Sequence, residues 1–450
     1  MKTKSASALF LLIIFYSNLS AQHSFDKTKL DDYLSLLNEN NKAMMGVVFA
    51  HDDTVDYKNY IGFASVQDGI ENSETTKFRI GSITKMFTAA MIFQLIDEKK
   101  LTLETKLADF YPQILNSKKI TISDLLRHRS GIHNITSDPD YSQYMSLGKS
   151  KDEMLKLIAA LKPDFMPNEK TAYSNSNYIL LGYIIEDVTN STYKQELEKR
   201  IAGKLKLVDT YYGSKINVQQ NEAASYKFEK DTWKIQPETD MSIPHGAGAV
   251  VSTAKDLTTF ISALFNRQLI TESSLKQMMK IKDGLGRGLM RFPFYDKTAY
   301  GHNGGIDGFV ANAAYFPDEN VAVAVTANGM NTNFNDILIG ILSIYFNIPY
   351  EMPDFSAKEI QLSVEELEKY VGEFSSQQLP LKITLKVDGG VLYGQATGQA
   401  AFPLTAFSAS EFHFEQAGLV IKFSTDDAGT ILYNAFELNQ GGGKFHYEKQ

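Results

Sequence analysis

The chain has 450 residues, no cysteine and a formal net charge of −8 at neutral pH. The absence of cysteine excludes disulfides, thiolate nucleophiles, cysteine zinc sites and a lipid-modified cysteine. The acidic balance disfavours nucleic acids and anionic lipids as partners, because both repel a negatively charged surface. The length suits one large domain and a smaller one, each held together by a hydrophobic core.

The first residues have the pattern of a secretory signal. Lys2 and Lys4 form a basic start, residues 8–16 an apolar core, and Leu19-Ser20-Ala21 a small-residue exit. The apolar core is too short to span a bilayer, which needs roughly 20 residues. We therefore predict that residues 1–21 are a signal peptide and that the mature protein is periplasmic or secreted, without a stable membrane anchor.

The segments after the signal alternate between helix and strand patterns. Residues 27–41 carry apolar side chains at helical spacing, and residues 45–63 have the pattern of a β-hairpin. Helical patterns dominate to about residue 206, and strand signals return at 246–252 and 298–327. This order predicts an α+β domain over 22–349, in which a helical region is inserted between the first and the later strands of an antiparallel sheet.

The character of the chain changes near residue 350. Residues 350–362 are predicted to be an extended linker, because Pro349 and Pro353 bias their neighbours away from helix. After a short helix, residues 363–450 consist of short alternating segments that predict a small all-β barrel or sandwich. This part contains no convincing catalytic cluster, so we expect a regulatory or assembly role for it. Nothing in the sequence specifies an oligomeric state.

Ser82 is the candidate nucleophile. It opens Ser82-Ile83-Thr84-Lys85, between a strand-like stretch at 78–81 and an apolar helical run at 86–96. Three residues make about one helical turn, so the hydroxyl and the amine lie on one face, near backbone N–H groups that stabilise negative charge. The pattern serine-x-x-lysine occurs six times in the chain, so the spacing alone does not identify a site. An ordinary role as a helix N-cap would also explain Ser82. The flanks favour a site, since a serine and a lysine in a buried helix need partners.

The second candidate motif is Tyr173-Ser174-Asn175, on a polar loop before an apolar helix at 178–185. The pattern tyrosine-x-asparagine also begins at three other tyrosines, which lie in the signal, in a predicted strand and at a predicted helix end: Tyr16, Tyr57 and Tyr345. A tyrosine can act as a base only if positive charge lowers its pKa from about 10. Lys85 could supply that charge, so we predict that Tyr173 is the base for Ser82.

The third candidate motif is the segment at 301–309, in which glycines lie on both sides of His302 and a strand at 310–316 follows. Glycines let the backbone approach a ligand closely and leave its N–H groups unshielded. The alternative is a glycine-rich hairpin whose histidine faces solvent.

Together and in this order, the three motifs resemble the serine β-lactamase and penicillin-binding-protein superfamily. The resemblance is to its class C-like branch of β-lactamases, D-alanyl-D-alanine carboxypeptidases, D-aminopeptidases and esterases. Segments at 122–132 and 246–257 are similar to that branch as well, and the resemblance covers roughly residues 26–349. The stretch at 366–374 resembles the start of the lipocalin-like domain that is often appended to such hydrolases.

The resemblance implies that Ser82 attacks a carbonyl and forms an acyl-enzyme, while Lys85 and Tyr173 move the proton to the leaving group. The N–H groups of Ser82 and Gly305 would hold the oxyanion. The remaining motif residues would bind substrate: Asn175, His302 and Gly304. No cofactor and no metal is implied.

His302 departs from the β-lactamase pattern, which has a lysine at this place. A neutral imidazole holds a carboxylate less well than an ammonium does, which disfavours β-lactams and carboxylate-terminated substrates. If His302 has to be charged to bind an anionic substrate, activity should fall above about pH 6.5.

We predict an exported serine hydrolase that cleaves amide or ester bonds of a small peptide or ester. D-amino-acid peptides are the leading substrate class, as in a D-Ala-D-Ala carboxypeptidase or a D-aminopeptidase. An esterase or a β-lactamase of the same fold is the first alternative, and a non-catalytic penicillin-binding receptor or scaffold is the second. The presence of Ser82, Lys85 and Tyr173 together favours the enzyme, because a purely structural copy has no need of all three.

Overall fold

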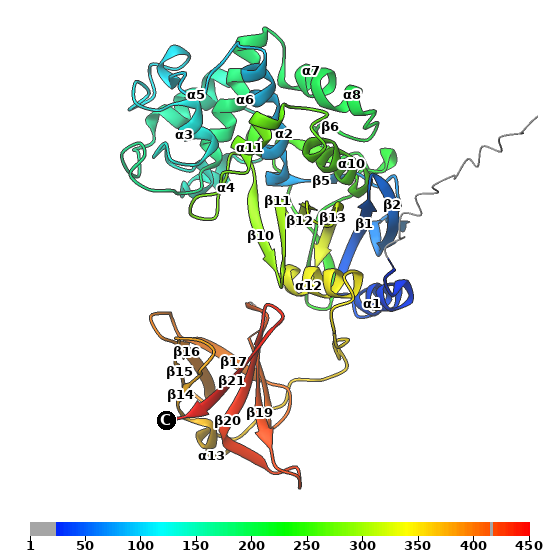
Figure 1. The fold of residues 1–450 in the computed structure, drawn as a ribbon. Coiled ribbons are helices and arrows are strands. Elements are labelled where there is room, and N and C mark those ends of the chain that lie inside the picture. The colour runs from blue at the N-terminus through cyan, green and yellow to red at the C-terminus, as the bar shows by residue number, and fades with distance from the viewer. Residues whose placement is uncertain (1–23, 415–416) are drawn as a thin grey trace, which may run out of the picture.

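The computed structural model describes residues 24–414 and 417–450 (Figure 1). The predicted signal peptide lies outside the described residues. The chain forms an α+β domain followed by a separate β-barrel, which confirms the predicted fold class.

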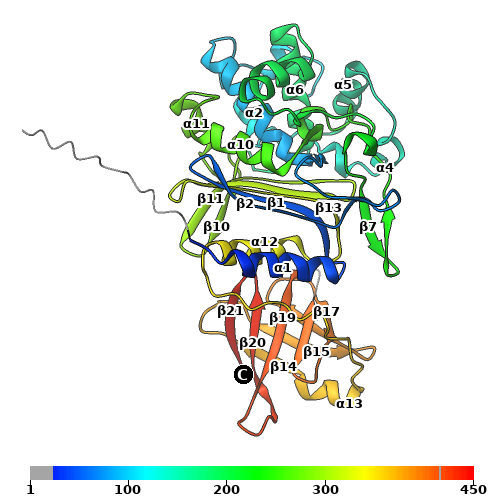
Figure 2. The same cartoon turned by 90° about the vertical axis from the view of Figure 1, so that its right-hand side faces the viewer.

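The α+β domain is built on an antiparallel sheet. Its six strands lie in this order: β10 (Met290–Phe294), β11 (Lys297–Ile306), β12 (Phe309–Phe316), β13 (Val321–Met330), β1 (Ala43–His51) and β2 (Thr54–Ile61). β1 pairs with β13 from Ala43 opposite Met330 to His51 opposite Val321. The first and the last strands of the domain therefore lie side by side. The helical region is inserted between the first and the later strands, as predicted. Both are apolar and buried along most of their length, because helices cover both faces of the sheet (Figure 2).

Two helices cover the lower face of the sheet in Figure 2: α1 (Lys27–Glu39) and α12 (Phe334–Tyr345). The helical region covers the upper face: α2 (Thr84–Asp97), α3 (Ile122–Leu126), α4 (Tyr141–Tyr144), α5 (Lys151–Ala160), α6 (Asn175–Thr189), α7 (Tyr193–Leu197), α8 (Gly203–Leu205), α9 (His245–Gly248), α10 (Ala254–Phe265) and α11 (Glu272–Met278). Almost every residue of α2 is buried, and Phe87 on it stacks on Phe260 of α10 at 3.7 Å between ring centroids. The apolar run after Ser82 therefore forms the centre of this core.

Short strands connect these layers. One small sheet has the order β5 (Phe78–Arg79), β9 (Val250–Ser252) and β6 (Tyr211–Tyr212). Two hairpins complete the domain: β3 (Phe63–Ser65) with β4 (Ile70–Glu71), and β7 (Tyr226–Glu229) with β8 (Thr232–Ile235). Among the residues that the structure describes, no helix has the length and the apolar composition needed to cross a bilayer.

The C-terminal domain begins with α13 (Val364–Leu367) and continues as a closed eight-stranded barrel. Its strands are β14 (Gly372–Ser375), β15 (Ile383–Asp388), β16 (Val391–Ala396), β17 (Phe402–Ala406), β18 (Glu411–Phe414), β19 (Leu419–Thr425), β20 (Ile431–Gln440) and β21 (Gly443–Lys449). Buried side chains, including Phe374, Phe412 and Phe436, pack together as its core. An eight-stranded barrel is just wide enough for such a filling.

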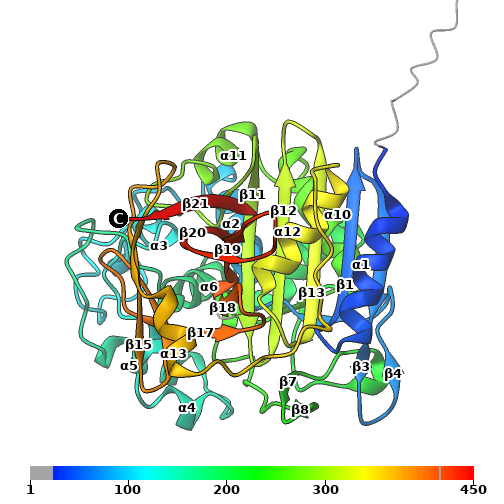
Figure 3. The same cartoon turned by 90° about the horizontal axis from the view of Figure 1, so that it is seen from below.

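The barrel lies below α1 and α12 and touches the large domain through its loops (Figures 1 and 3). The Tyr295 hydroxyl, in the turn between β10 and β11, donates to the Gly442 carbonyl at 3.2 Å. A Cβ atom on Gly418 would lie 2.4 Å from the Asp336 carboxylate of α12. The barrel is therefore packed directly against α12 and the lower end of β10.

Candidate active site

Ser82 lies in a short 3-10 turn, Gly81–Ile83, directly between β5 and α2. Gly81 has a φ of +51°, and a Cβ atom on it would lie 2.7 Å from the backbone nitrogen of Gly305. Only glycine tolerates both the conformation and the contact. The turn thus holds Ser82 against β11, so that the first and the third motif meet although they are far apart in the sequence.

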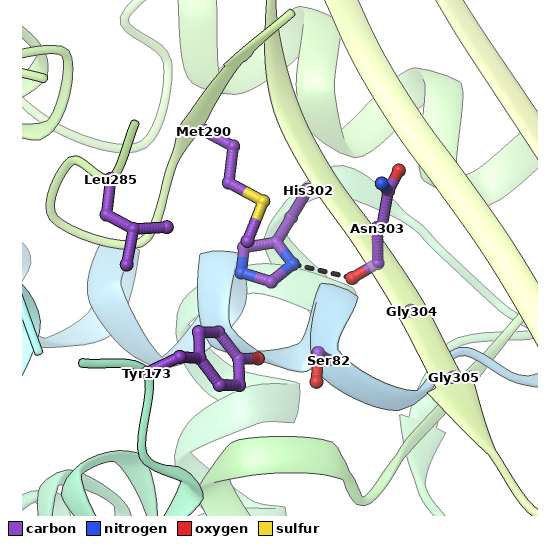
Figure 4. Close-up of a pocket in the computed structure, with 8 residues that line it drawn as sticks. All are labelled: Ser82, Tyr173, Leu285, Met290, His302, Asn303, Gly304 and Gly305. Carbon is purple, nitrogen blue, oxygen red and sulfur yellow. Dashed lines mark hydrogen bonds between the residues drawn. The ribbon is translucent and has the colours of Figure 1, made fainter. Parts of the chain in front are cut away.

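Ser82 opens into a cavity of about 530 Å³ (Figure 4). The cavity is lined by residues of the nucleophile turn, the loop before α6, the segment 285–290 and β11: Ser82, Tyr173, Leu285, Met290, His302, Asn303, Gly304 and Gly305. The structure therefore brings all three predicted motifs to one place. Among the described residues, no group of three histidine, aspartate or glutamate side chains could hold a metal ion.

Lys85 is completely buried behind Ser82. Its Nζ lies 2.9 Å from Ser82 Oγ, and it donates to Asn175 Oδ1 and to the Ala247 carbonyl, each at 2.8 Å. Burial lowers the pKa of Lys85 well below its ordinary value. A neutral amine has two N–H donors and one lone pair. With both donors bound to oxygens that can only accept, the lone pair is left for the hydroxyl proton of Ser82.

Tyr173 reaches the cavity from the loop before α6. Its ring stacks on that of His128, with 4.4 Å between the centroids, and Lys85 Nζ lies 4.9 Å from the Tyr173 centroid. Burial raises the pKa of Tyr173 above its ordinary value, and a hydrogen bond with Ser82 opposes this only in part. The prediction that Lys85 would lower this pKa is therefore wrong. Burial disfavours the charged form of both groups. It disfavours the tyrosinate, and it also disfavours the positive charge on Lys85 that would stabilise the tyrosinate.

Asn175 begins α6 and is held by the loop that contains Asn134 and Thr136. Its Oδ1 accepts from Lys85, and its Nδ2 donates to Asn134 Oδ1 at 3.2 Å and to Thr136 Oγ1 at 3.1 Å. In this arrangement Asn175 orients Lys85. Its predicted contact with a substrate amide stays a prediction, and it would require the loop to release the Nδ2 group.

His302 lies on β11 with its ring over Ser82 and Tyr173 (Figure 4) and is 3% exposed. Its Nδ1 donates to the Asn303 carbonyl at 2.5 Å, so Nε2 carries the lone pair. Burial, and then the neighbouring Lys85, lower the pKa of His302 to about 3. Burial therefore favours the neutral ring, so we expect no loss of activity near pH 6.5 from the titration of His302.

His128, Leu285 and Met290 belong to the site although the motifs did not identify them. His128 is buried and lies beneath Tyr173. The Ser174 N–H donates to His128 Nδ1 at 3.1 Å, which fixes the start of the Tyr173 loop. Only the family-like segment at 122–132 could have pointed to His128, and no pattern pointed to Leu285 or Met290.

We expect Gly304→Ala to reduce the reactivity of Ser82 roughly 100-fold, the order of loss expected for a displacement of about 1 Å at a reacting centre. A Cβ atom on Gly304 would lie 1.9 Å from the Ile80 carbonyl, a backbone atom that cannot swing aside. β11 must then move away from the nucleophile turn. The rate of labelling by a fluorophosphonate measures this, with the unfolding temperature as the check that the variant is folded. Labelling at the parent rate would contradict the close packing.

The sequence model of the Beta-lactamase family matches residues 35–342. The chain belongs to the β-lactamase family. It is a serine hydrolase, as predicted, and the match includes all three motifs. Among curated relatives, the teichoic acid D-alanine hydrolase of Staphylococcus aureus (strain NCTC 8325 / PS 47) is 27% identical over 330 residues, which cover 69% of this chain and 77% of the relative.

Solved structures agree with the β-lactamase fold. The D-stereospecific amidohydrolase from Streptomyces sp. has a TM-score of 0.63 at 24% identity, and the match covers 72% of this chain and 100% of that one. The octameric penicillin-binding protein homologue from Pyrococcus abyssi has a TM-score of 0.66 at 23% identity, and the match covers 94% of this chain and 100% of that one. The second match extends into the barrel, which fits the predicted lipocalin-like domain.

Proposed function

We propose that this enzyme hydrolyses amide or ester bonds formed by the carboxyl group of a D-amino acid, through an acyl-serine on Ser82. The observation that carries the proposal is the contact between Ser82 and a buried Lys85 whose other two partners can only accept hydrogen bonds. The names of the relatives support the substrate class, since they include a teichoic acid D-alanine hydrolase and a D-amino acid amidase.

The neutral state of His302 selects among the possible D-amino-acid substrates. A substrate of a D-Ala-D-Ala carboxypeptidase ends in a carboxylate, and the neutral His302 cannot pair with that charge. A D-aminoacyl amide or ester has no carboxylate beyond the scissile bond. We therefore place D-aminoacyl donors, as in a D-aminopeptidase or a D-alanyl esterase, ahead of carboxypeptidase substrates and β-lactams.

In the proposed acylation step, Ser82 Oγ attacks the substrate carbonyl carbon while the Lys85 amine takes the hydroxyl proton. The negative charge that develops on the carbonyl oxygen lies between the N–H groups of Ser82 and Gly305. When the tetrahedral intermediate collapses, the bond to the leaving group breaks and Tyr173 donates its hydroxyl proton to that group. The proton on Lys85 then returns the tyrosine to its neutral state. In deacylation, water attacks the acyl-serine carbonyl carbon and gives a proton to Tyr173, which passes its own proton to Lys85. Lys85 returns that proton to Ser82 Oγ as the ester bond breaks, and the D-amino acid is released.

D- and L-alanine p-nitroanilide test the substrate class directly. We expect the parent to hydrolyse the D isomer at least about 100-fold faster in kcat/KM, within the range of discrimination that pocket contacts provide. Ser82→Ala should hydrolyse neither isomer, and nitrocefin should be a poor substrate. Equal rates for the two isomers, or faster hydrolysis of nitrocefin, would reject the D-aminoacyl assignment.

The pH dependence tests the role of Lys85. Because burial lowers the pKa of Lys85, its neutral form is present well below pH 10.5. With a neutral ester as substrate, kcat/KM should rise as Lys85 loses its proton and then stay level as the pH increases. His302 should add no step between pH 5 and 8, because its pKa is about 3. A rate that increases continuously to about pH 10 would show that Lys85 has an ordinary pKa.

We also propose that the enzyme acts outside the cytoplasm, with residues 1–21 as the signal peptide, 22–349 as the catalytic domain, 350–362 as the linker and 363–450 as the barrel domain. The name of the teichoic acid D-alanine hydrolase relative supports a location at the cell envelope. Intact-mass measurement of the exported protein tests cleavage after Ala21. A mass that still includes residues 1–21 would contradict it.

A further inference from the structure

A second cavity, of about 470 Å³, lies between the α+β domain and the barrel. Its walls come from β10 to β13, from α12 and from the tip of the hairpin that joins β20 and β21, which reaches this region in Figures 1 and 3. Side chains alternate between the faces of a strand. On β12, Ala313 belongs to the core with α2, whereas Ala314 lines this cavity. The cavity is therefore on the face of the sheet opposite the core around α2.

The lining is mostly apolar. Aromatic rings and aliphatic side chains from the sheet and from α12 form most of it: Phe292, Phe294, Phe316, Leu338, Ile339 and Leu342. The polar side-chain groups are the Tyr295 hydroxyl and three amides: Asn303, Asn312 and Asn335. No lysine, arginine, aspartate or glutamate is among the residues that line it. An apolar wall with a few polar groups, at this size and between domains, is the composition of small-molecule sites, and the lack of charge favours a neutral ligand.

Two of these amide groups, those of Asn303 and Asn312, hold each other in place. Asn312 is 6% exposed, and its Nδ2 donates to Asn303 Oδ1 at 2.6 Å. An asparagine amide has two N–H donors and an acceptor oxygen, so this one bond leaves the pair with further capacity for a ligand group. An amide group on a ligand also donates and accepts hydrogen bonds, so it matches the remaining capacity of the asparagine pair.

The barrel forms the remaining wall. Gly441 and Gly442 have φ values of +59° and +78°, and a Cβ atom on Gly442 would lie 3.2 Å from Ile339 Cγ2. Tyr295 donates to the Gly442 carbonyl. The barrel therefore closes one side of the cavity, and a ligand in it contacts both domains.

The cavity shares a residue with the active site. Asn303 lines both cavities, and its carbonyl accepts the hydrogen bond from His302 Nδ1. We propose that the interdomain cavity is an effector site for a neutral aryl or alkyl amide, and that its occupancy changes the rate of the hydrolase through Asn303 and His302. This proposal goes beyond the hydrolysis reaction and does not depend on which substrate is cleaved.

N-phenylacetamide is the probe, used with full-length protein. Binding is measured by calorimetry after Ser82 has been blocked with a fluorophosphonate. The activity effect is measured as kcat/KM for a neutral ester. Leu338→Trp fills the cavity from α12, and Leu115→Trp is the matched control on a side chain that is 61% exposed. We expect N-phenylacetamide to bind the parent and Leu115→Trp and to change the kcat/KM of both at least about twofold. It should bind Leu338→Trp at least about tenfold more weakly, a loss of about 1.4 kcal/mol, and its addition should leave the kcat/KM of that variant unchanged.

Absence of binding to the parent, equal binding to Leu338→Trp, or binding without a change in kcat/KM would each overturn the effector site. A second measurement remains decisive if Leu338→Trp does not fold. An azide-bearing N-phenylacetamide is photolysed with the parent, and the modified peptides are identified by mass spectrometry. We expect labels at 338–342 or 441–443. Labels confined to Leu285, Met290 and the rest of the active-site cavity would overturn the proposal.

Discussion

Replacing Lys85 with methionine is expected to reduce kcat/KM by about 10²- to 10⁴-fold, the contribution of a positioned general base. Methionine retains much of the length of the side chain in the apolar surroundings of α2 but provides no lone pair for the Ser82 proton. Hydrolysis of D-alanine p-nitroanilide measures the effect, together with the unfolding temperature.

The chain provides a matched control for this variant. Lys255 follows Ser252 at the same spacing as Lys85 follows Ser82, but its side chain is 51% exposed and pairs with Glu74. We expect Lys255→Met to retain the parent activity, since an exposed ion pair contributes about 0 to 1 kcal/mol to stability. A Lys85→Met enzyme within about tenfold of the parent would show that another group is the base.

Asp307→Ala is expected to lower the free energy of unfolding by about 3–5 kcal/mol, the usual result of removing one partner from a buried ion pair. The side chains of Arg79 and Asp307 are 2% and 0% exposed, and Arg79 Nη1 lies 2.9 Å from Asp307 Oδ2. Thr239 Oγ1 also donates to this carboxylate, at 2.7 Å. The variant leaves a buried guanidinium with one carboxylate fewer, and Glu238 compensates only in part because it is itself partly exposed.

Urea unfolding measures this loss, and Glu272→Ala is the control. Glu272 pairs with Lys276 on the surface, with side chains 57% and 70% exposed, so its removal should leave the midpoint of urea unfolding nearly unchanged. Arg79 lies three residues before Ser82, and Asp307 directly follows β11. The ion pair therefore ties the nucleophile turn to the strand of His302. Equal effects of the two substitutions would show that it does not stabilise the site.

The sequence predicted the positions of the main elements because local patterns determine them. The Ser82 turn before an apolar helix and the short strands of the C-terminal barrel each follow from periodicity and turn residues within short segments. The contact between Ser82 and Lys85 follows in the same way from one turn of helix. The structure confirms this placement, at 2.9 Å between Oγ and Nζ.

The electrostatic state of the site could not be predicted in this way. The pKa values of Lys85, Tyr173 and His302 are set mainly by burial, and residues from distant parts of the chain produce that burial. From the sequence we expected a charged Lys85 to lower the pKa of Tyr173. The packed core around α2 and α6 favours the neutral forms instead. His128 was missed for the same reason, because its place beneath Tyr173 depends on how two loops fold against α6.

The intact mass of the protein after incubation with a fluorophosphonate tests the central claim, an activated Ser82, most directly. Ser273→Ala is the control, because Ser273 is an exposed serine with Lys276 at the same spacing. We expect one adduct on the parent and on Ser273→Ala, and none on Ser82→Ala. An adduct that persists in Ser82→Ala, or a parent that is not labelled, would contradict an acyl-serine mechanism at this residue.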